Sequence, residues 1–221
     1  MREIFKQIPL YRLIMYCNET NMEKSVLDCG AGGDCPPLSL FEEYGYLTKG
    51  IEFNFEQLEK ANKYANKKGQ NLNIENGDMR KLKFNNESFS FGYSYNSVFH
   101  MTKKEISKSI NEMKRVLKKD GLLFVNFLTT NDFRCGDGID IGENQYEQMD
   151  DDVPVIHSYF EESEAESYFN DMEILYKENR VLERIFEGKK VRQGFVDYIL
   201  KKVKWDIFLY ISFLYIITLD Y

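Results

Sequence analysis

The sequence predicts a single α/β domain with a doubly wound, mostly parallel sheet and helices on both faces. Three observations predict this class. Short apolar strand-like segments alternate with helical ones from about residue 25 to residue 130, and the run at 121–130 is a continuous, mostly apolar segment without charge. Two further strand-like segments near the end are joined around Glu187 and Gly188. Alternation implies parallel pairing with right-handed crossovers. A continuous apolar run indicates a strand covered on both faces, and the last pair indicates an antiparallel hairpin.

The first strand is expected at residues 25–28, where a short apolar run ends in an acid. It leads into a glycine-rich loop, and Pro36 and Pro37 suit the first turn of the helix that follows. That helix ends near Gly45. The segment therefore forms a first β-α unit, preceded by a candidate N-terminal helix that starts near Pro9.

A second strand is expected at 46–52, followed by a helix that Asn54 caps and Gly69 ends. Residues 72–78 predict a third strand, and the aromatic segment 89–96 a fourth. These elements continue the same alternation, which keeps the strands parallel.

The next helix has the strongest local signals in the chain. Thr102 and Glu105 form a capping box, and apolar residues recur at helical spacing until Asp120 and Gly121 break the pattern. After the fifth strand the alternation stops. A polar, Gly-rich stretch, a short helical segment near 161–169 and the C-terminal hairpin follow.

Composition excludes several classes of protein. The 221-residue chain has a net charge of −7 and no basic stripe, so we expect no nucleic-acid partner. The four cysteines lack the paired spacing of a zinc site, and only His100 and His157 are available beside them, so we expect no metal. Reduced thiols and the lack of an export signal favour the cytoplasm.

The last segment, 204–221, is expected to be an apolar extension of a domain that spans 1–203. Its thirteen uncharged residues at 207–219 are too few for a bilayer span of about 20 residues. We therefore expect Trp205, Phe208 and Phe213 to pack on the domain, and regard a membrane-directed tail as the weaker alternative.

Glycines at positions 30, 32 and 33 follow the first strand directly. They allow backbone amides to approach a ligand where Cβ atoms would collide with it, so a nucleotide-like ligand is expected. The dinucleotide fingerprint fails because Cys35 stands at its third glycine, and a P-loop fails because no Gly-Lys-Ser/Thr follows.

Five motifs occur in order over about residues 20–130: VLDCGAGG at 26–33, GIE at 50–52, GDM at 77–79, the strand ending YSYNSVFHM, and DGLLFVNF after the capped helix. In this order and spacing they resemble class I S-adenosylmethionine-dependent methyltransferases, of the type-11 kind. The resemblance implies a Rossmann-like, seven-stranded sheet with a reversed final strand. It also implies S-adenosylmethionine as cofactor, in-line methyl transfer to a small-molecule acceptor, and a substrate-pocket insert at about 131–160.

The resemblance also implies where the cofactor lies. Glu52, about twenty residues past the glycine loop, is placed to accept hydrogen bonds from the ribose diol. Asp78 would accept from the adenine amino group with Met79 beside the ring, backbone of Tyr95 or Asn96 would hold the amino-acid end, and Asp28 would support the loop. The expected cofactor-binding residues are Asp28, Gly30, Ala31, Gly32, Glu52, Phe53, Asp78, Met79, Tyr95 and Asn96.

Candidate catalytic residues are His100 and Tyr95, which follow the fourth strand. The candidate substrate pocket consists of Tyr11, His100, His157 and Tyr159. A simple packing role remains open for His100 and Tyr11. The acidic segment Asp137 to Asp152 is expected to be a solvated, mobile loop, although its charge would also favour a cationic acceptor.

Two other functions stay open. One is a non-catalytic S-adenosylmethionine-binding or scaffold protein of the same fold, because no catalytic base is obvious. The other is a nicotinamide-dependent oxidoreductase, which Cys35 disfavours. The sequence does not predict the acceptor or the oligomeric state.

Overall fold

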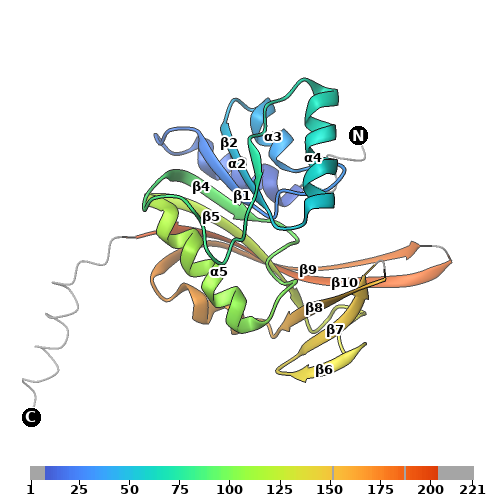
Figure 1. Cartoon of the computed structure of the whole chain (residues 1–221). Helices are drawn as coiled ribbons and strands as arrows, with labels where there is room; N and C mark the ends of the chain where they lie inside the picture. Colours follow the sequence, from blue (N-terminus) through green and yellow to red (C-terminus); the bar gives the residue numbers. More distant parts are fainter. Residues whose placement is uncertain (1–7, 151, 187, 204–221) are drawn as a thin grey trace, which may run out of the picture.

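Figure 1 shows the computed structural model of the protein, which describes residues 8–150, 152–186 and 188–203. Seven strands form the main sheet in the order β3-β2-β1-β4-β5-β10-β9. The first five pair in parallel, whereas β10 runs antiparallel to both β5 and β9. This confirms the predicted fold class. The strands are β1 (Ser25–Cys29), β2 (Leu47–Glu52), β3 (Ile74–Asn76), β4 (Phe89–Ser94), β5 (Leu117–Thr129), β9 (Met172–Phe186) and β10 (Lys189–Lys202).

Helices cover both faces of this sheet. On one face, α2 (Ile8–Asn18), α3 (Leu38–Glu43) and α4 (Phe55–Lys68) contribute to a core with Val26, Phe91 and Phe124. On the other face, α5 (Lys103–Val116) and the 3-10 helix η1 (Glu164–Phe169) pack on alternate residues of the same strands. The two cores explain why β5 is apolar almost throughout, since its residues alternate between them.

The predicted caps are present. The Asn54 side chain accepts hydrogen bonds from the backbone of Glu56 and Gln57, and Gly69 ends α4 at a φ of +67°. Thr102 and Glu105 form the capping box of α5. These local signals depend on neighbouring residues only, which is why the sequence shows them clearly.

Two boundaries differ from expectation. The third strand is three residues long rather than seven, and α5 ends at Val116, four residues before the expected break at Asp120. Leu117 already pairs with Phe89 of β4, and an irregularity in that ladder absorbs the residues before Gly121. Pairing with β4 therefore overrides the helical pattern.

The stretch after β5 corrects the prediction of a mobile acidic loop. It forms a three-stranded antiparallel unit, called the insert here, of β6 (Ile139–Gly142), β7 (Gln145–Asp150) and β8 (Val153–Phe160). Beyond the end of β4, β8 pairs in parallel with Leu128 and Thr129 of β5. The insert thus lies at the carboxyl end of the parallel strands, below β9 and β10 in Figure 1.

At the end of the chain, β9 and β10 form the predicted hairpin, whose tip extends well past the sheet in Figure 1. No helix in the described part of the chain is long and apolar enough to cross a bilayer. Residues 204–221, with Trp205, Phe208 and Phe213, lie outside the described residues, so their packing stays a prediction.

Candidate active site

The glycine loop lies where the first two strands end. The backbone N–H groups of Gly30 and Ala31 donate to the carbonyl of Ile51, and that of Gly33 donates to Gln57 at the start of α4. Gly30 has a φ of +108°, and a Cβ there would lie 2.0 Å from Ser97 Oγ. The loop is therefore held against β2, α4 and the segment after β4, in a path that only glycine at position 30 allows.

Glu52 faces this loop. Its Oε2 lies 2.6 Å from the position that a Cβ would take at Gly32, and its Oε1 accepts a hydrogen bond of 2.8 Å from the Asn54 backbone. Burial raises the pKa of Glu52, whereas the backbone N–H groups of Asn54 and Gly32 favour its charged form. The carboxylate thus borders the space beside the glycines, where a ribose diol would meet an acceptor.

Asp28 lies beneath the loop and is 1% exposed. Its Oδ2 is buried, and the Tyr93 hydroxyl faces the carboxyl. Burial raises the pKa of Asp28 to about 8, against the opposing effect of Tyr93. Asp28 thus supports the loop, while the backbone at Gly30, which leaves no room for a Cβ, is what allows a ligand such as S-adenosylmethionine to approach closely.

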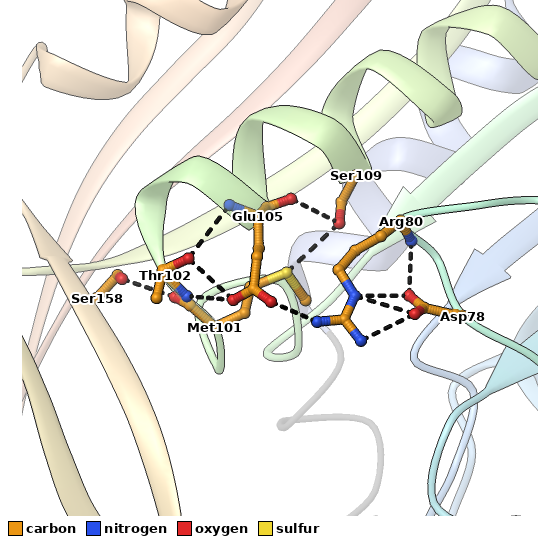
Figure 2. A network of polar contacts seen from close by, with 7 residues as sticks. All are labelled: Asp78, Arg80, Met101, Thr102, Glu105, Ser109 and Ser158. Carbon is orange, nitrogen blue, oxygen red and sulfur yellow. Dashed lines mark hydrogen bonds and ion pairs between the residues drawn. The ribbon is translucent and has the colours of Figure 1, made fainter.

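Asp78 is held more tightly than the sequence suggests. The Arg80 guanidinium donates hydrogen bonds to both carboxylate oxygens of Asp78 (Figure 2). Nη2 of Arg80 lies 2.8 Å from Asp78 Oδ2. This ion pair lowers the pKa of Asp78 and keeps it ionised. The Arg80 guanidinium also donates to Glu105 of the α5 capping box at 2.5 Å. Because Arg80 takes both oxygens, the predicted contact with the adenine amino group would have to use their remaining lone pairs.

Met79 and Phe53 flank the same region. The Met79 methyl group lies 3.7 Å from the position that a Cβ would take at Gly30, so this side chain borders the loop. Phe53 is 68% exposed, with the Arg80 guanidinium 5.7 Å from its ring centroid. Both side chains offer apolar surface of the kind that a planar base needs.

Asn96 follows β4 with a φ of +53°. Its backbone N–H donates to Asn126 Oδ1 at 2.7 Å, and the Asn126 side chain donates back to Asn96 Oδ1 at 2.6 Å. Asn126 is fully buried at the end of β5. This reciprocal pair uses the Asn96 N–H, so the cofactor ammonium is expected at a carbonyl of Tyr95 or Asn96.

Tyr95 is half-buried at the end of β4, with its ring 6.0 Å from that of Phe124. Burial raises its pKa, and the charge of Arg180 opposes that shift. A neutral phenol here can position a ligand but does not act as a base at neutral pH. Its predicted catalytic role stays a prediction.

The two histidines meet although they are far apart in the sequence. The His100 and His157 ring centroids are 4.8 Å apart, and His157 Nε2 lies 3.3 Å from Asp150 Oδ2. His157 is 3% exposed, whereas His100 is exposed to solvent. Neighbouring protein groups that partly desolvate the His100 imidazole lower its pKa, with His157 adding to the shift. Burial also lowers the pKa of His157, against the opposing charge of Asp150.

The other two predicted pocket residues lie elsewhere. Tyr159 is fully buried and donates to Gln148 Oε1 at 2.9 Å, so an acceptor would reach it only if neighbouring side chains moved. The Tyr11 ring packs edge to face on Tyr44 at 6.0 Å. Tyr11 thus contacts the residue that follows α3, and both its place in a pocket and its packing on the sheet stay predictions.

Several residues at these sites have no clear sequence signal. Ser97, Gln57 and Asn126 touch the loop or hold the end of β4, and each looks ordinary in the sequence. Asp150 is one of several acidic residues in its segment, so the sequence does not single it out. Arg134, which donates to Asp150 at 2.6 Å, follows β5 and belongs to no motif. Only pairing of the insert with β5 brings these groups together.

The family model described as "Methyltransferase domain" matches residues 27–125. The sequence matches no curated protein. A solved S-adenosylmethionine-dependent methyltransferase from Methanosarcina mazei is 25% identical, with a TM-score of 0.67 over 86% of this chain and 97% of that one.

Two further solved structures share the fold. The PH0226 protein from Pyrococcus horikoshii is 19% identical, with a TM-score of 0.67 over 89% of each chain. An S-adenosylmethionine-dependent methyltransferase from Clostridium acetobutylicum is 16% identical, with a TM-score of 0.63 over 87% of this chain and 89% of that one. Residues 27–125 thus form a methyltransferase domain, and the chain is similar in fold to S-adenosylmethionine-dependent methyltransferases, which implies S-adenosylmethionine as its cofactor.

Proposed function

We propose that the protein transfers a methyl group from S-adenosylmethionine to a small-molecule acceptor bound between the loop after β4 and the insert. The observation that carries this proposal is the glycine cradle at Gly30 and Gly32, with the Glu52 carboxylate against it. In parallel sheets, ligands bind at the carboxyl ends of the strands. The cradle and the insert both lie at that end.

The cofactor is assigned to the cradle as follows. Glu52 accepts from the ribose hydroxyls, Met79 and Phe53 border the adenine, and the carbonyls after β4 receive the ammonium group. Asp28 supports the loop from below. This assignment gives the ribose hydroxyls and the ammonium group hydrogen-bond acceptors, and gives the adenine ring apolar neighbours.

The acceptor is assigned to the other side of the β4 end, where His100 and His157 meet. When bound, S-adenosylmethionine supplies an activated methyl group, which the acceptor lone pair takes as the carbon–sulfur bond breaks. The chain needs to align the acceptor and exclude water. His100 and His157, whose ring centroids are 4.8 Å apart, border this site.

Calorimetry with S-adenosylmethionine and S-adenosylhomocysteine tests the cofactor site directly. We expect saturable binding of both with one site per chain. Folded protein that binds neither would overturn the proposal. Incubation with methyl-labelled cofactor and a panel of amines, phenols, thiols and carboxylic acids then tests transfer, with label expected on one class.

The non-catalytic alternative predicts a different result. A binding or scaffold protein would retain cofactor affinity but label no member of the panel. An NADH titration checks the nicotinamide alternative, for which we expect no saturable binding because Cys35 replaces the third glycine of the fingerprint. We also place the protein in the cytoplasm, since none of its four cysteines forms a disulfide.

A further inference from the structure

Three potential metal ligands converge at the insert. His100 comes from the loop after β4, Asp150 from the end of β7 and His157 from β8. One nitrogen or oxygen of each lies within 4.8 Å of those of the other two. No pair of these residues is adjacent in the sequence, so the cluster is a product of the fold.

We propose that His100, Asp150 and His157 bind a divalent transition-metal ion of the Zn²⁺ type. Two imidazoles and one carboxylate are the ligand set of many three-residue sites for such ions, which leave at least one position open. The inference goes beyond the proposed methyl transfer, although His100 and His157 also border the proposed acceptor site. Metal binding is therefore measured without cofactor or acceptor, so that the two proposals can fail separately.

The distances fit such an ion with little rearrangement. Bonds of about 2.0–2.1 Å in tetrahedral geometry place ligand atoms about 3.3 Å apart. His157 Nε2 and Asp150 Oδ2 are already separated by 3.3 Å. One ligand atom of each of the three residues lies within 4.8 Å of the others, so His100, the exposed member of the cluster, must move closer for the ion to bind all three.

Neighbouring groups orient the ligands in the manner of metal sites. Arg134 Nη1 donates to Asp150 Oδ1 at 2.6 Å and leaves Oδ2 facing His157. His157 is almost fully buried, which limits the movement of its ring. Ordering of a ligand carboxylate by a second partner is typical of bound transition metals.

Metal binding by the untagged, full-length protein tests the proposal in the absence of S-adenosylmethionine. The protein is dialysed against a chelator and then titrated with Zn²⁺ in competition with a chromogenic chelator. We expect one Zn²⁺ per chain. Titration with Co²⁺ should give visible d–d absorption without a thiolate charge-transfer band, because the proposed ligands are nitrogen and oxygen.

Matched variants assign the ligands. Asp150→Asn should weaken Zn²⁺ binding by at least about 100-fold, more than the loss of an outer-shell partner. Glu147→Gln removes an exposed carboxylate from the same strand and should change nothing. His100→Ala should also lose the ion, and because His100 is exposed it avoids the folding defect that a change at buried His157 risks. Cys135→Ser should keep both affinity and spectrum.

Two results would overturn the proposal. One is less than a tenth of an equivalent of Zn²⁺ held by folded protein at saturating concentration. The other is an affinity that Asp150→Asn and His100→Ala leave within about twofold of the parent, which would indicate adventitious binding elsewhere. Failure of the cofactor titration would leave this outcome unaffected, so the two proposals fail separately.

Discussion

The cofactor region and the acceptor region are built in different ways. Around the glycine loop, most groups come from a short stretch of chain and the backbone itself makes the contacts. Gly30 and Ala31 donate to Ile51, and Glu52 meets Gly32 at the next strand end. At the insert, by contrast, His100 lies beside Asp150 of β7 and His157 of β8, which are about 50 residues further along the chain.

This difference explains why the cofactor region can be recognised in a sequence and the acceptor region cannot. Backbone contacts at a strand end demand particular residue types at fixed spacing, so they leave motifs. Contacts between side chains from distant segments demand only that the segments fold together. The four predictions below test whether the two regions are also energetically separate, from the largest expected effect to the smallest.

Gly30→Ala should abolish most cofactor affinity. The new Cβ would lie 2.0 Å from Ser97 Oγ, so the loop or Ser97 must move. We expect binding of S-adenosylmethionine to weaken by at least about 100-fold, or about 3 kcal/mol, measured by calorimetry. Gly33→Ala is the control, because its φ of +97° carries the same backbone cost while the nearest atom lies 3.9 Å away.

The double variant Gly30→Ala, Ser97→Gly sharpens that result. Removing the Ser97 side chain relieves the collision, so part of the affinity should return. If Gly30→Ala and Gly33→Ala lost the same amount of affinity for S-adenosylmethionine, the positive φ of these residues, and not the close approach of Gly30 to Ser97, would explain the need for glycine.

Asp28→Asn should change how stability depends on pH. The folded chain holds the Asp28 proton up to about pH 8, whereas an unfolded chain releases it near pH 4. The unfolded state therefore binds fewer protons between these limits, and stability falls as pH rises through that window. The variant lacks this fall, so its stability relative to the parent should improve by about 1.4 kcal/mol per pH unit.

Urea unfolding at pH 5.5, 7 and 8.5 measures this effect. Asp34→Asn, an exposed carboxylate of the same loop, should follow the parent at each pH. Parallel pH profiles for Asp28→Asn and the parent would mean that Asp28 is ionised in the folded protein over the whole range.

Glu52→Gln should weaken S-adenosylmethionine by about 1 to 3 kcal/mol, because the ribose hydroxyls would lose a charge-assisted acceptor. Calorimetry provides the dissociation constants. Glu59→Gln, on the exposed side of α4, should leave them unchanged. An unaltered affinity in Glu52→Gln would place the ribose away from this carboxylate.

His100→Ala should have the smallest effect on the cofactor. If the two regions are separate, the dissociation constant of S-adenosylmethionine should stay within about twofold. The link from His100 to the glycine loop is its backbone N–H, which donates to Ser97 beside Gly30, and the variant keeps that hydrogen bond. Methyl transfer to the identified acceptor should fall in the same variant. If cofactor affinity fell as much as methyl transfer, the loop after β4 that contains His100 would also determine the shape of the glycine cradle.

Much of the fold follows from local patterns. The capping residues Asn54 and Thr102 bind backbone groups within one helical turn. In β5, both faces of the strand are buried, so apolar residues are needed at almost every position. The sequence placed the end of α5 too late. The residues after Val116 favour a helix by their type, but Leu117 pairs with Phe89 of β4 instead. A short-range pattern contains no information on that competition.

The insert shows the same limit for the candidate site. Its acidic composition resembles a solvated loop, yet Gln145 and Gln148 are buried and the Lys103 backbone donates to Gln145 at 2.7 Å. Those hydrogen bonds span separate elements, so they leave no spacing in the sequence. Asp150 could not be distinguished from its acidic neighbours without them.

By itself, the sequence determined the alternation of strands and helices, the glycine loop and the position of Glu52, because each depends on residue type within a few neighbours. Tertiary structure decided that Arg80 takes the Asp78 carboxylate, that 139–160 is a sheet rather than a loop, and that two distant histidines and Asp150 meet. The physical reason is range: backbone geometry is set locally, whereas the approach of side chains from distant segments is set by how whole elements pack.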